Sequence, residues 1–111
     1  MREAGWKDRI LFLVGRLRAI RVSGASMQPA LTDDDVVLVK RPSKINVEDI
    51  VVADHPFKSS VTILKRVASI DEDGRFELHG DNPDESSDSR TFGAIPRENI
   101  RGKVVCRLKR R

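Results

Sequence analysis

The two side chains most able to carry out a reaction, Ser26 and Lys65, stand in segments far apart in the chain. Small residues precede Ser26, and Lys65 ends the apolar run 61–64. A lysine that is removed from water loses its charge, and the neutral amine can take a proton from a serine hydroxyl. If the fold brings the two segments together, they predict a serine nucleophile activated by lysine. That pairing favours a serine protease.

The residues around Ser26 are suited to an extended peptide. Gly24 and Ala25 are small enough for a substrate backbone to approach closely, and Met27 offers a flexible apolar wall for a substrate side chain. Pro29 restricts the preceding Gln28 to an extended backbone. Glycine and serine also build ordinary turns, so this segment alone is a weak signal.

Lys65 stands in a predicted strand, whose side chains alternate between two faces. Val61, Ile63 and Val67 share its face, whereas Arg66 points to the other. Arginine stays charged in any protein environment, so only Lys65 can become a base, and Arg66 is better interpreted as an ion-pair partner for the acidic loop 81–88. The alternative for Lys65 is a solvent-facing lysine that protects a strand edge, and this stretch alone favours that alternative.

Several short strands must position these residues. Apolar runs separated by polar turns predict strands at 36–39, 50–53, 61–70, 75–79 and about 102–108. Asp71 to Gly74 predict a hairpin turn, because Asp and Gly tolerate left-handed backbone, and residues 80–90 read as a polar loop. The pattern predicts a mostly β fold, a small antiparallel β barrel or folded sheet with a short N-terminal helix.

Residues 1–20 are expected to form an amphipathic helix ahead of a core at 21–111. Its apolar positions recur at helical spacing and form one face: Trp6, Ile10, Leu13, Leu17 and Ile20. Packing of that face on the core and binding at a membrane interface, helped by basic flanks, are the two alternatives. The apolar run 10–14 is too short to span a bilayer or to serve as a secretory signal. Any membrane contact is therefore expected to be peripheral.

Composition narrows the classes of function. The 111 residues suffice for one domain. The net charge of +4 is divided into basic ends and an acidic middle, without a basic stretch rich in aromatic residues, so nucleic-acid binding is not expected. Cys106 is the single cysteine and reads as a strand residue. His55 and His79 stand on separate predicted elements, so no metal site is predicted.

Four segments in order resemble the conserved boxes of the type I signal peptidase family of Ser/Lys proteases. They are residues 24–29 (Gly-Ala-Ser-Met-Gln-Pro), 35–39 (Asp-Val-Val-Leu-Val), 64–67 (Leu-Lys-Arg-Val) and the polar box 80–90, which begins Gly-Asp-Asn and ends Asp-Ser-Arg. The resemblance covers about residues 21–105. An eleven-residue polar box in the correct order after the lysine makes it specific.

The resemblance implies a role for each matching residue. Ser26 would be the nucleophile and Lys65 the general base, with no cofactor. Ser86 would orient the lysine amine, while Asp81, Asp88 and Arg90 would brace the site. The backbone N–H of Ser26 would donate to the oxyanion, in a segment where Gly24, Ala25, Met27 and Pro29 face the substrate.

Departures from the family pattern narrow the resemblance. Gly24 stands where the main-line bacterial enzymes carry a serine that completes the oxyanion hole, which leaves the second donor unassigned, and Ala30 replaces a threonine. Only 14 residues separate Lys65 from Gly80, so we do not expect the extra β-domain of the large enzymes. Their membrane anchors are not expected either. Together with the segment 54–57, these features most resemble the maturation proteases of nickel-type superoxide dismutase.

This narrower resemblance implies removal of a propeptide from a nickel-type superoxide dismutase precursor in the cytoplasm, with the substrate bound as an extended strand. Two rivals remain. One is a signal peptidase that cleaves exported preproteins at a membrane. The other is a self-cleaving, repressor-like regulator, although the 20-odd residues before the core are too few for a helix-turn-helix domain. A catalytically dead binding module is disfavoured because both reactive residues are present.

Overall fold

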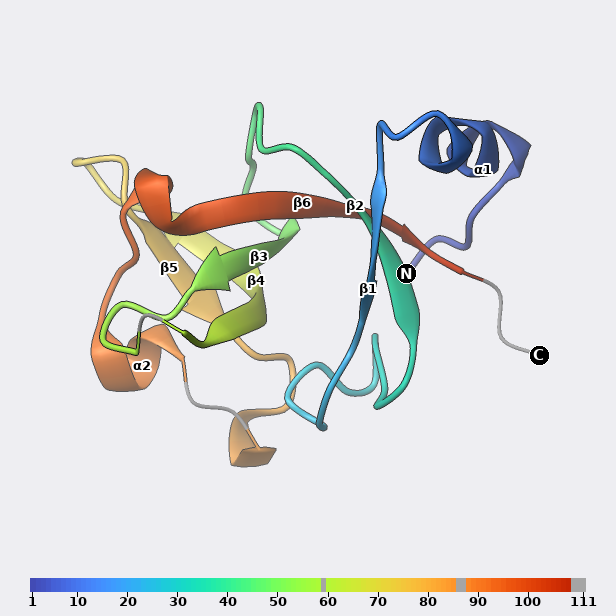
Figure 1. Cartoon of the computed structure of the whole chain (residues 1–111). Coiled ribbons are helices and arrows are strands. Elements are labelled where there is room, and N and C mark those ends of the chain that lie inside the picture. The colour runs from blue at the N-terminus through green and yellow to red at the C-terminus, as the bar shows by residue number, and fades with distance from the viewer. Residues whose placement is uncertain (59, 86–87, 109–111) are drawn as a thin grey trace.

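Six antiparallel strands form one strongly twisted sheet in the computed structural model, which describes residues 1–58, 60–85 and 88–108 (Figure 1). The strands are β1 (Arg18–Arg21), β2 (Val36–Lys40), β3 (Ile50–Asp54), β4 (Thr62–Ile70), β5 (Phe76–His79) and β6 (Ile100–Arg107). Their order across the sheet is β1-β2-β6-β3-β4-β5. β1 and β5 are its two edges, so this is a folded sheet and not a closed barrel.

The mostly β fold and the strands expected at 36–39, 50–53, 61–70, 75–79 and 102–108 are confirmed within one or two residues. The hairpin turn between β4 and β5 is confirmed as well. Gly74 has a φ of 78°, and the backbone N–H of Asp71 donates to the carbonyl of Arg75 at 2.9 Å. Glycine adopts this left-handed backbone without the steric cost that a Cβ would add.

The N-terminal helix is shorter than the expected segment 1–20. Helix α1 (Trp6–Leu13) ends before Gly15, whose φ of 78° is typical of the residue after a helix. Leu17 and Ile20 continue the helical spacing but leave the helix: Leu17 is buried beside Leu38 and Cys106, and Ile20 lies in β1. No helix among the described residues is long and apolar enough to cross a membrane.

Of the two alternatives for the apolar face of α1, packing on the core is not what the structure shows. Trp6 is 69% exposed and Leu13 79%, and Ile10, Leu11 and Phe12 are exposed as well. Its first turn is held instead by Asp8, which accepts a hydrogen bond from the backbone N–H of Gly5 at 2.8 Å and pairs with Arg2. The apolar side chains of α1 therefore remain on the surface.

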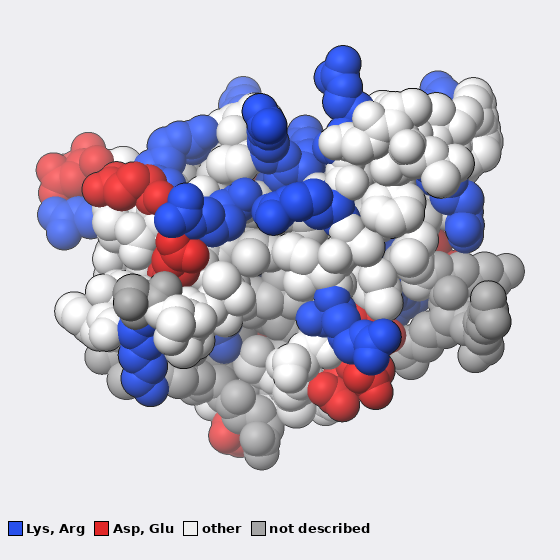
Figure 2. Space-filling model, viewed as in Figure 1, with Lys and Arg blue, Asp and Glu red and all other residues white. Residues whose placement is uncertain are grey.

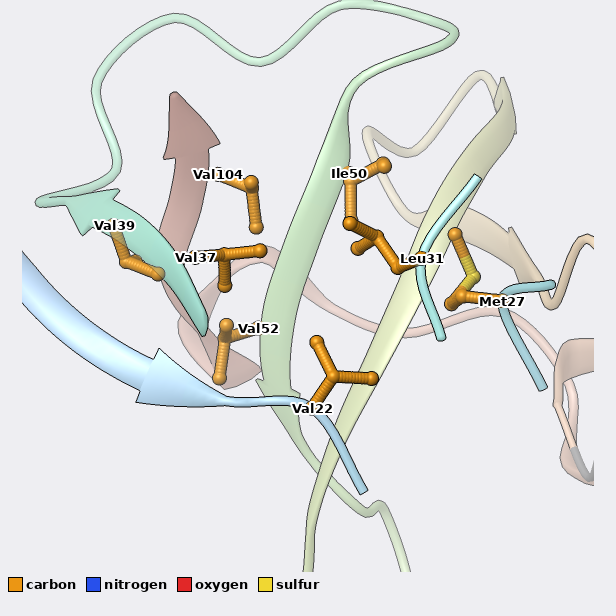
Figure 3. Packing of buried hydrophobic residues seen from close by; sticks show 8 residues of the cluster. All are labelled: Val22, Met27, Leu31, Val37, Val39, Ile50, Val52 and Val104. Carbon is orange, nitrogen blue, oxygen red and sulfur yellow. The ribbon is translucent and has the colours of Figure 1, made fainter. Parts of the chain in front are cut away.

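The two largest hydrophobic clusters of the described residues pack against the sheet. One lies beside β2, β3 and β6 and includes three residues from the loop that follows β1 (Figure 3): Val22, Met27, Leu31, Val37, Val39, Ile50, Val52 and Val104. The other joins β3, β4 and β5 to Ile45, Ile95 and Ile100. Cys106 is fully buried in β6, as the strand prediction required, and burial raises the pKa of its thiol.

Candidate active site

Lys65 is buried in the middle of β4. It pairs with Val51 of β3, and its side chain is only 5% exposed. The alternative of a solvent-facing edge lysine is therefore wrong, because β3 and the loop after β5 enclose this part of β4. Burial lowers the pKa of the Lys65 amine, the Arg90 guanidinium lowers it further, and the Asp88 carboxylate opposes both. The net shift increases the fraction of neutral amine, the form that can act as a base.

Ser26 lies half-buried in the loop between β1 and β2. Just after it, Met27 and Leu31 are 1% and 0% exposed, and both point into the first hydrophobic cluster (Figure 3). Burial of each such side chain contributes roughly 1.5–3 kcal/mol, so the two fix one side of the loop to the core. Before Ser26, the backbone N–H of Gly24, at a φ of 86°, donates to Asp33 at 2.8 Å. The nucleophile candidate is thus held from both sides.

The fold brings Ser26 and Lys65 to the same surface hollow, about 170 Å³ in volume, which we call the Ser26 hollow. Residues of the loop after β1 and of β4 line it together: Val22, Ser23, Ser26, Met27, Thr62, Ile63, Leu64 and Lys65. A serine and a lysine of lowered pKa that line the same hollow supply the two side chains that acyl transfer without histidine requires.

Of the four residues expected to face a substrate, Met27 lines the Ser26 hollow, although its side chain belongs to the core. The other three, Gly24, Ala25 and Pro29, are absent from the lining. Gly24 instead turns the chain toward Asp33, and Ala25 offers its carbonyl to the polar loop. The geometry thus gives these residues a part in shaping the loop.

Arg66 forms an ion pair with Asp81, which lies in the acidic loop 81–88 where the sequence predicted its partner. Its Nε and Nη2 atoms each donate to one carboxylate oxygen of Asp81 at 2.9 Å, and Nη1 donates to the carbonyl of Glu48 at 2.8 Å. Two parallel bonds fix both position and direction of the carboxylate. Asp81 therefore attaches the start of the polar loop to the strand that carries Lys65.

Asp88 is the buried centre of the same loop. Its side chain is 1% exposed, and it accepts hydrogen bonds from the backbone N–H of Gly80 at 2.8 Å and from the backbone N–H and Nε of Arg90, both at 3.0 Å. It thereby also caps the short helix α2 (Ser89–Phe92). Asp88 thus draws the two ends of the loop together beside Lys65. Ser86, the expected orienting hydroxyl, lies outside the described residues.

Asn82 is a positioning residue that was not among the predicted site residues. Its backbone N–H donates to the carbonyl of Ser26 at 2.8 Å, and its side-chain Nδ2 donates to the carbonyl of Ala25 at 3.1 Å. These bonds connect the polar loop to the nucleophile segment across more than fifty residues of chain. Its place next to Asp81 in the polar box was the available signal, but a sequence does not show which backbone an amide will meet.

Comparison with known proteins shows to which peptidases the chain is similar. The family model described as "Peptidase S24-like" matches residues 6–105. The mitochondrial inner membrane protease subunit 1 of Xenopus tropicalis is 36% identical over an alignment that covers 78% of this chain and 65% of that protein. The human protein of the same name is 30% identical, with 80% and 68% covered. The chain thus spans about two thirds of the length of these relatives.

Proposed function

Because this chain belongs to the Peptidase S24-like family, we propose that it is a serine endopeptidase in which Ser26 is the nucleophile and Lys65 the general base. The observation that carries the proposal is the burial of Lys65 on the hollow that Ser26 also lines. A fully charged surface lysine could not serve as a base near neutral pH, whereas an amine of lowered pKa can.

In the proposed reaction, the neutral Lys65 amine takes the proton of the Ser26 hydroxyl as the serine oxygen attacks the scissile carbonyl. The backbone N–H of Ser26 donates to the oxyanion that forms. The lysine ammonium then protonates the leaving amine, and the acyl group remains on Ser26. Lys65 then takes a proton from water as the water oxygen attacks the acyl carbon, and the lysine ammonium returns that proton to the Ser26 oxygen as the ester bond breaks and the new carboxylate leaves. Asp81, Asp88 and Arg90 keep the polar loop in place, and Ser86 orients the amine.

The proposed substrate is the N-terminal propeptide of a nickel-type superoxide dismutase precursor, bound as an added strand in the cytoplasm. This part rests on the resemblance of Gly24 and the compact core to that subfamily. Strand addition has support in the fold, since β1 pairs with β2 on one side only. A gene for such a dismutase beside the gene for this chain would further support the proposal.

The test is to incubate the purified chain with that precursor and to measure release of the propeptide by mass spectrometry. Ser26→Ala and Lys65→Met should each reduce cleavage to background while the circular dichroism spectrum is unchanged. The matched controls are Ser69→Ala, an exposed serine on the same strand as Lys65, and Lys44→Met, an exposed lysine. Full activity of either site variant would disprove the Ser/Lys mechanism.

A membrane signal peptidase is the second candidate, and the exposed apolar side chains of α1 favour it. Trp6 and Leu13 are exposed together with Arg9 and Arg16 nearby, a combination suited to the surface of an anionic bilayer. The names of the two relatives also refer to the mitochondrial inner membrane. This candidate requires sedimentation of the chain with anionic vesicles, loss of sedimentation in Trp6→Ser/Leu13→Ser, and cleavage of an exported preprotein.

The same experiments test the third, repressor-like alternative. The purified chain incubated alone would then cut itself into two defined fragments in a reaction that depends on Ser26 and Lys65. A stable chain that cleaves the dismutase precursor in trans supports the propeptide protease. Fragments from the chain alone, with the precursor intact, support self-cleavage instead.

A further inference from the structure

A continuous groove leads away from the Ser26 hollow. The adjoining hollow, about 130 Å³, shares five lining residues with it: Val22, Ser23, Thr62, Ile63 and Leu64. It in turn shares Ile20, Val52 and Thr62 with a third hollow of about 520 Å³. Because neighbouring hollows have walls in common, they form one path that runs along β1 and β4 from the candidate catalytic residues to the third hollow.

Strand edges border this path. β1 is an edge strand that pairs with β2 alone. In β4, residues 62–65 pair with β3, and pairing with β5 begins only at Arg66. Within the described strands, the outer edges of β1 and of residues 62–65 therefore have no strand beside them. An extended peptide can form backbone hydrogen bonds with such an edge, which sets its direction along the groove.

The far end of the groove is basic. Arg18, Arg41 and Arg101 line the third hollow, which we call the arginine hollow, together with the single acidic residue Asp54. Asp54 is paired with Arg101 through Nε at 2.7 Å. Among the described residues, no carboxylate forms an ion pair with Arg18 or Arg41. The arginine hollow thus keeps an excess of two positive charges, and Figure 2 shows Lys and Arg side chains in a row across this face.

We propose that the arginine hollow is a specificity subsite for an acidic side chain of the peptide substrate. Arg18 lies five residues before Ser23, and Thr62 lies three residues before Lys65. At about 3.3 Å per residue of extended chain, the arginine hollow is roughly 10–16 Å along the groove from the reacting groups. The acidic residue therefore stands three to five residues from the scissile bond. This inference rests on the proposed function, because it assumes that the groove holds a substrate.

A peptide fits these observations better than a nucleic acid or a lipid surface. The arginines lie at one end of a groove that is bordered by open strand edges and lined along its length by apolar side chains together with Arg21, Ser23 and Thr62, an arrangement that suits one extended peptide backbone. Arginine binds a single carboxylate in a planar, two-bond geometry, and this gives the subsite its selectivity.

The experiment compares peptides that span the cleavage site and carry Glu, Gln or Lys at each position up to five residues on either side of the scissile bond. At one position three to five residues away, wild type should cleave the Glu peptide about fivefold more efficiently, in kcat/KM, than the Gln peptide. In Arg18→Gln/Arg41→Gln this preference should fall to about one. In Arg18→Glu/Arg41→Glu it should reverse in favour of Lys. Arg75→Gln, in the exposed β4–β5 turn, is the matched control.

Binding of the same labelled peptides to Ser26→Ala, followed by fluorescence anisotropy, separates this inference from the proposed function. Charge-dependent binding to Ser26→Ala, with no cleavage by wild type, would support the subsite and contradict the proposed enzyme. Cleavage by wild type with equal efficiency for Glu, Gln and Lys at every position would overturn the subsite and leave the enzyme in place. Loss of vesicle or oligonucleotide binding in the arginine variants, with peptide selectivity unchanged, would also overturn it.

Discussion

The two halves of the candidate site are held in different ways. Lys65 stands on β4, where ladder hydrogen bonds with β3 fix its backbone and burial encloses its side chain. Ser26 stands on a loop, and its position depends on Met27 and Leu31 in the core and on two hydrogen bonds from Asn82. The strand half is thus defined by the sheet itself, and the loop half by a few contacts distant in sequence.

The surroundings of Lys65 therefore set the pKa of the base, whereas the surroundings of Ser26 set the position of the nucleophile. Around Lys65 the buried environment and the charges of Asp88 and Arg90 set a pKa, so changes there should alter pH dependence and stability. Around Ser26 the contacts set a position, so changes there should alter the rate at saturating substrate. The following experiments test this division.

The largest expected effect is the dependence of activity on pH. The general base must be neutral, so kcat/KM should fall about tenfold for each unit below the pKa of Lys65. Because burial and Arg90 lower that pKa from 10.5, the midpoint should lie below 10.5 in wild type and move to higher pH in Arg90→Gln. The measurement is the pH profile of kcat/KM for both proteins. Arg75→Gln should leave the midpoint in place, and an equal midpoint in Arg90→Gln would contradict the assignment.

Removal of Asp88 should cause the next largest effect, a loss of stability in the strand half. Asp88→Ala leaves the buried N–H of Gly80 without its acceptor and Arg90 without its carboxylate, at a cost of about 2–3 kcal/mol in the free energy of unfolding. Urea unfolding followed by circular dichroism measures it. The exposed Asp73→Ala, whose partner Arg75 is also exposed, should cost less than about 0.5 kcal/mol. Similar losses in both variants would show that burial of Asp88 has no energetic weight.

Lys65→Met should unfold at a higher denaturant concentration than wild type, although it is inactive. Below the pKa of folded Lys65, the native state holds a buried charge that the unfolded chain keeps in water, which costs about 1.4 kcal/mol for each unit of pKa lowering. As the pH rises from that pKa toward 10.5, wild type loses this cost and the difference should diminish. Urea unfolding at several pH values tests the sign. A Lys65→Met variant less stable than wild type at pH 6 would contradict it.

The smallest effect on stability is expected in the loop that carries Ser26. Asn82→Ala removes the hydrogen bond to the carbonyl of Ala25 and should cost only about 0.5–1.5 kcal/mol in stability. It should nevertheless lower kcat about tenfold or more with KM little changed, because Ser26 is displaced. Asn99→Ala is the matched control, since Asn99 donates in the same way to the carbonyl of Asp54. The same decrease in kcat in both variants would assign Asn82 a merely structural role.

Most of the sheet could be predicted from the sequence because each strand is a short apolar run between polar turns. The exception is informative. Leu17 and Ile20 keep the helical spacing of α1, and only the left-handed backbone of Gly15 shows that the helix has ended. A glycine within a helical pattern can lie inside a continuing helix or can follow its last residue. Here the burial of Leu17 against Cys106 shows that the helix has ended.

Some features of the candidate site could likewise be predicted from the sequence, and others could not. The pairing of Arg66 with the acidic loop 81–88 could be predicted, because an arginine among the apolar residues of a strand stays charged and needs a nearby carboxylate, whereas the structure identifies that carboxylate as Asp81. The role of Asn82 could not, because its acceptors are backbone carbonyls of a segment more than fifty residues away. The groove to Arg18 and Arg41 was also hidden, as it exists only where β1 lies near β4.

The sequence alone determined the strands from β2 to β6, the hairpin turn and the presence of a serine and a lysine able to perform acyl transfer. Those features depend on residue type and local spacing. Only the tertiary structure decided that Lys65 is buried, that Ser26 shares its hollow and that arginines stand at the far end of the groove. The physical reason is that the pKa of an amine and the shape of a groove depend on neighbours contributed by distant segments, and these neighbours meet only when the sheet has formed.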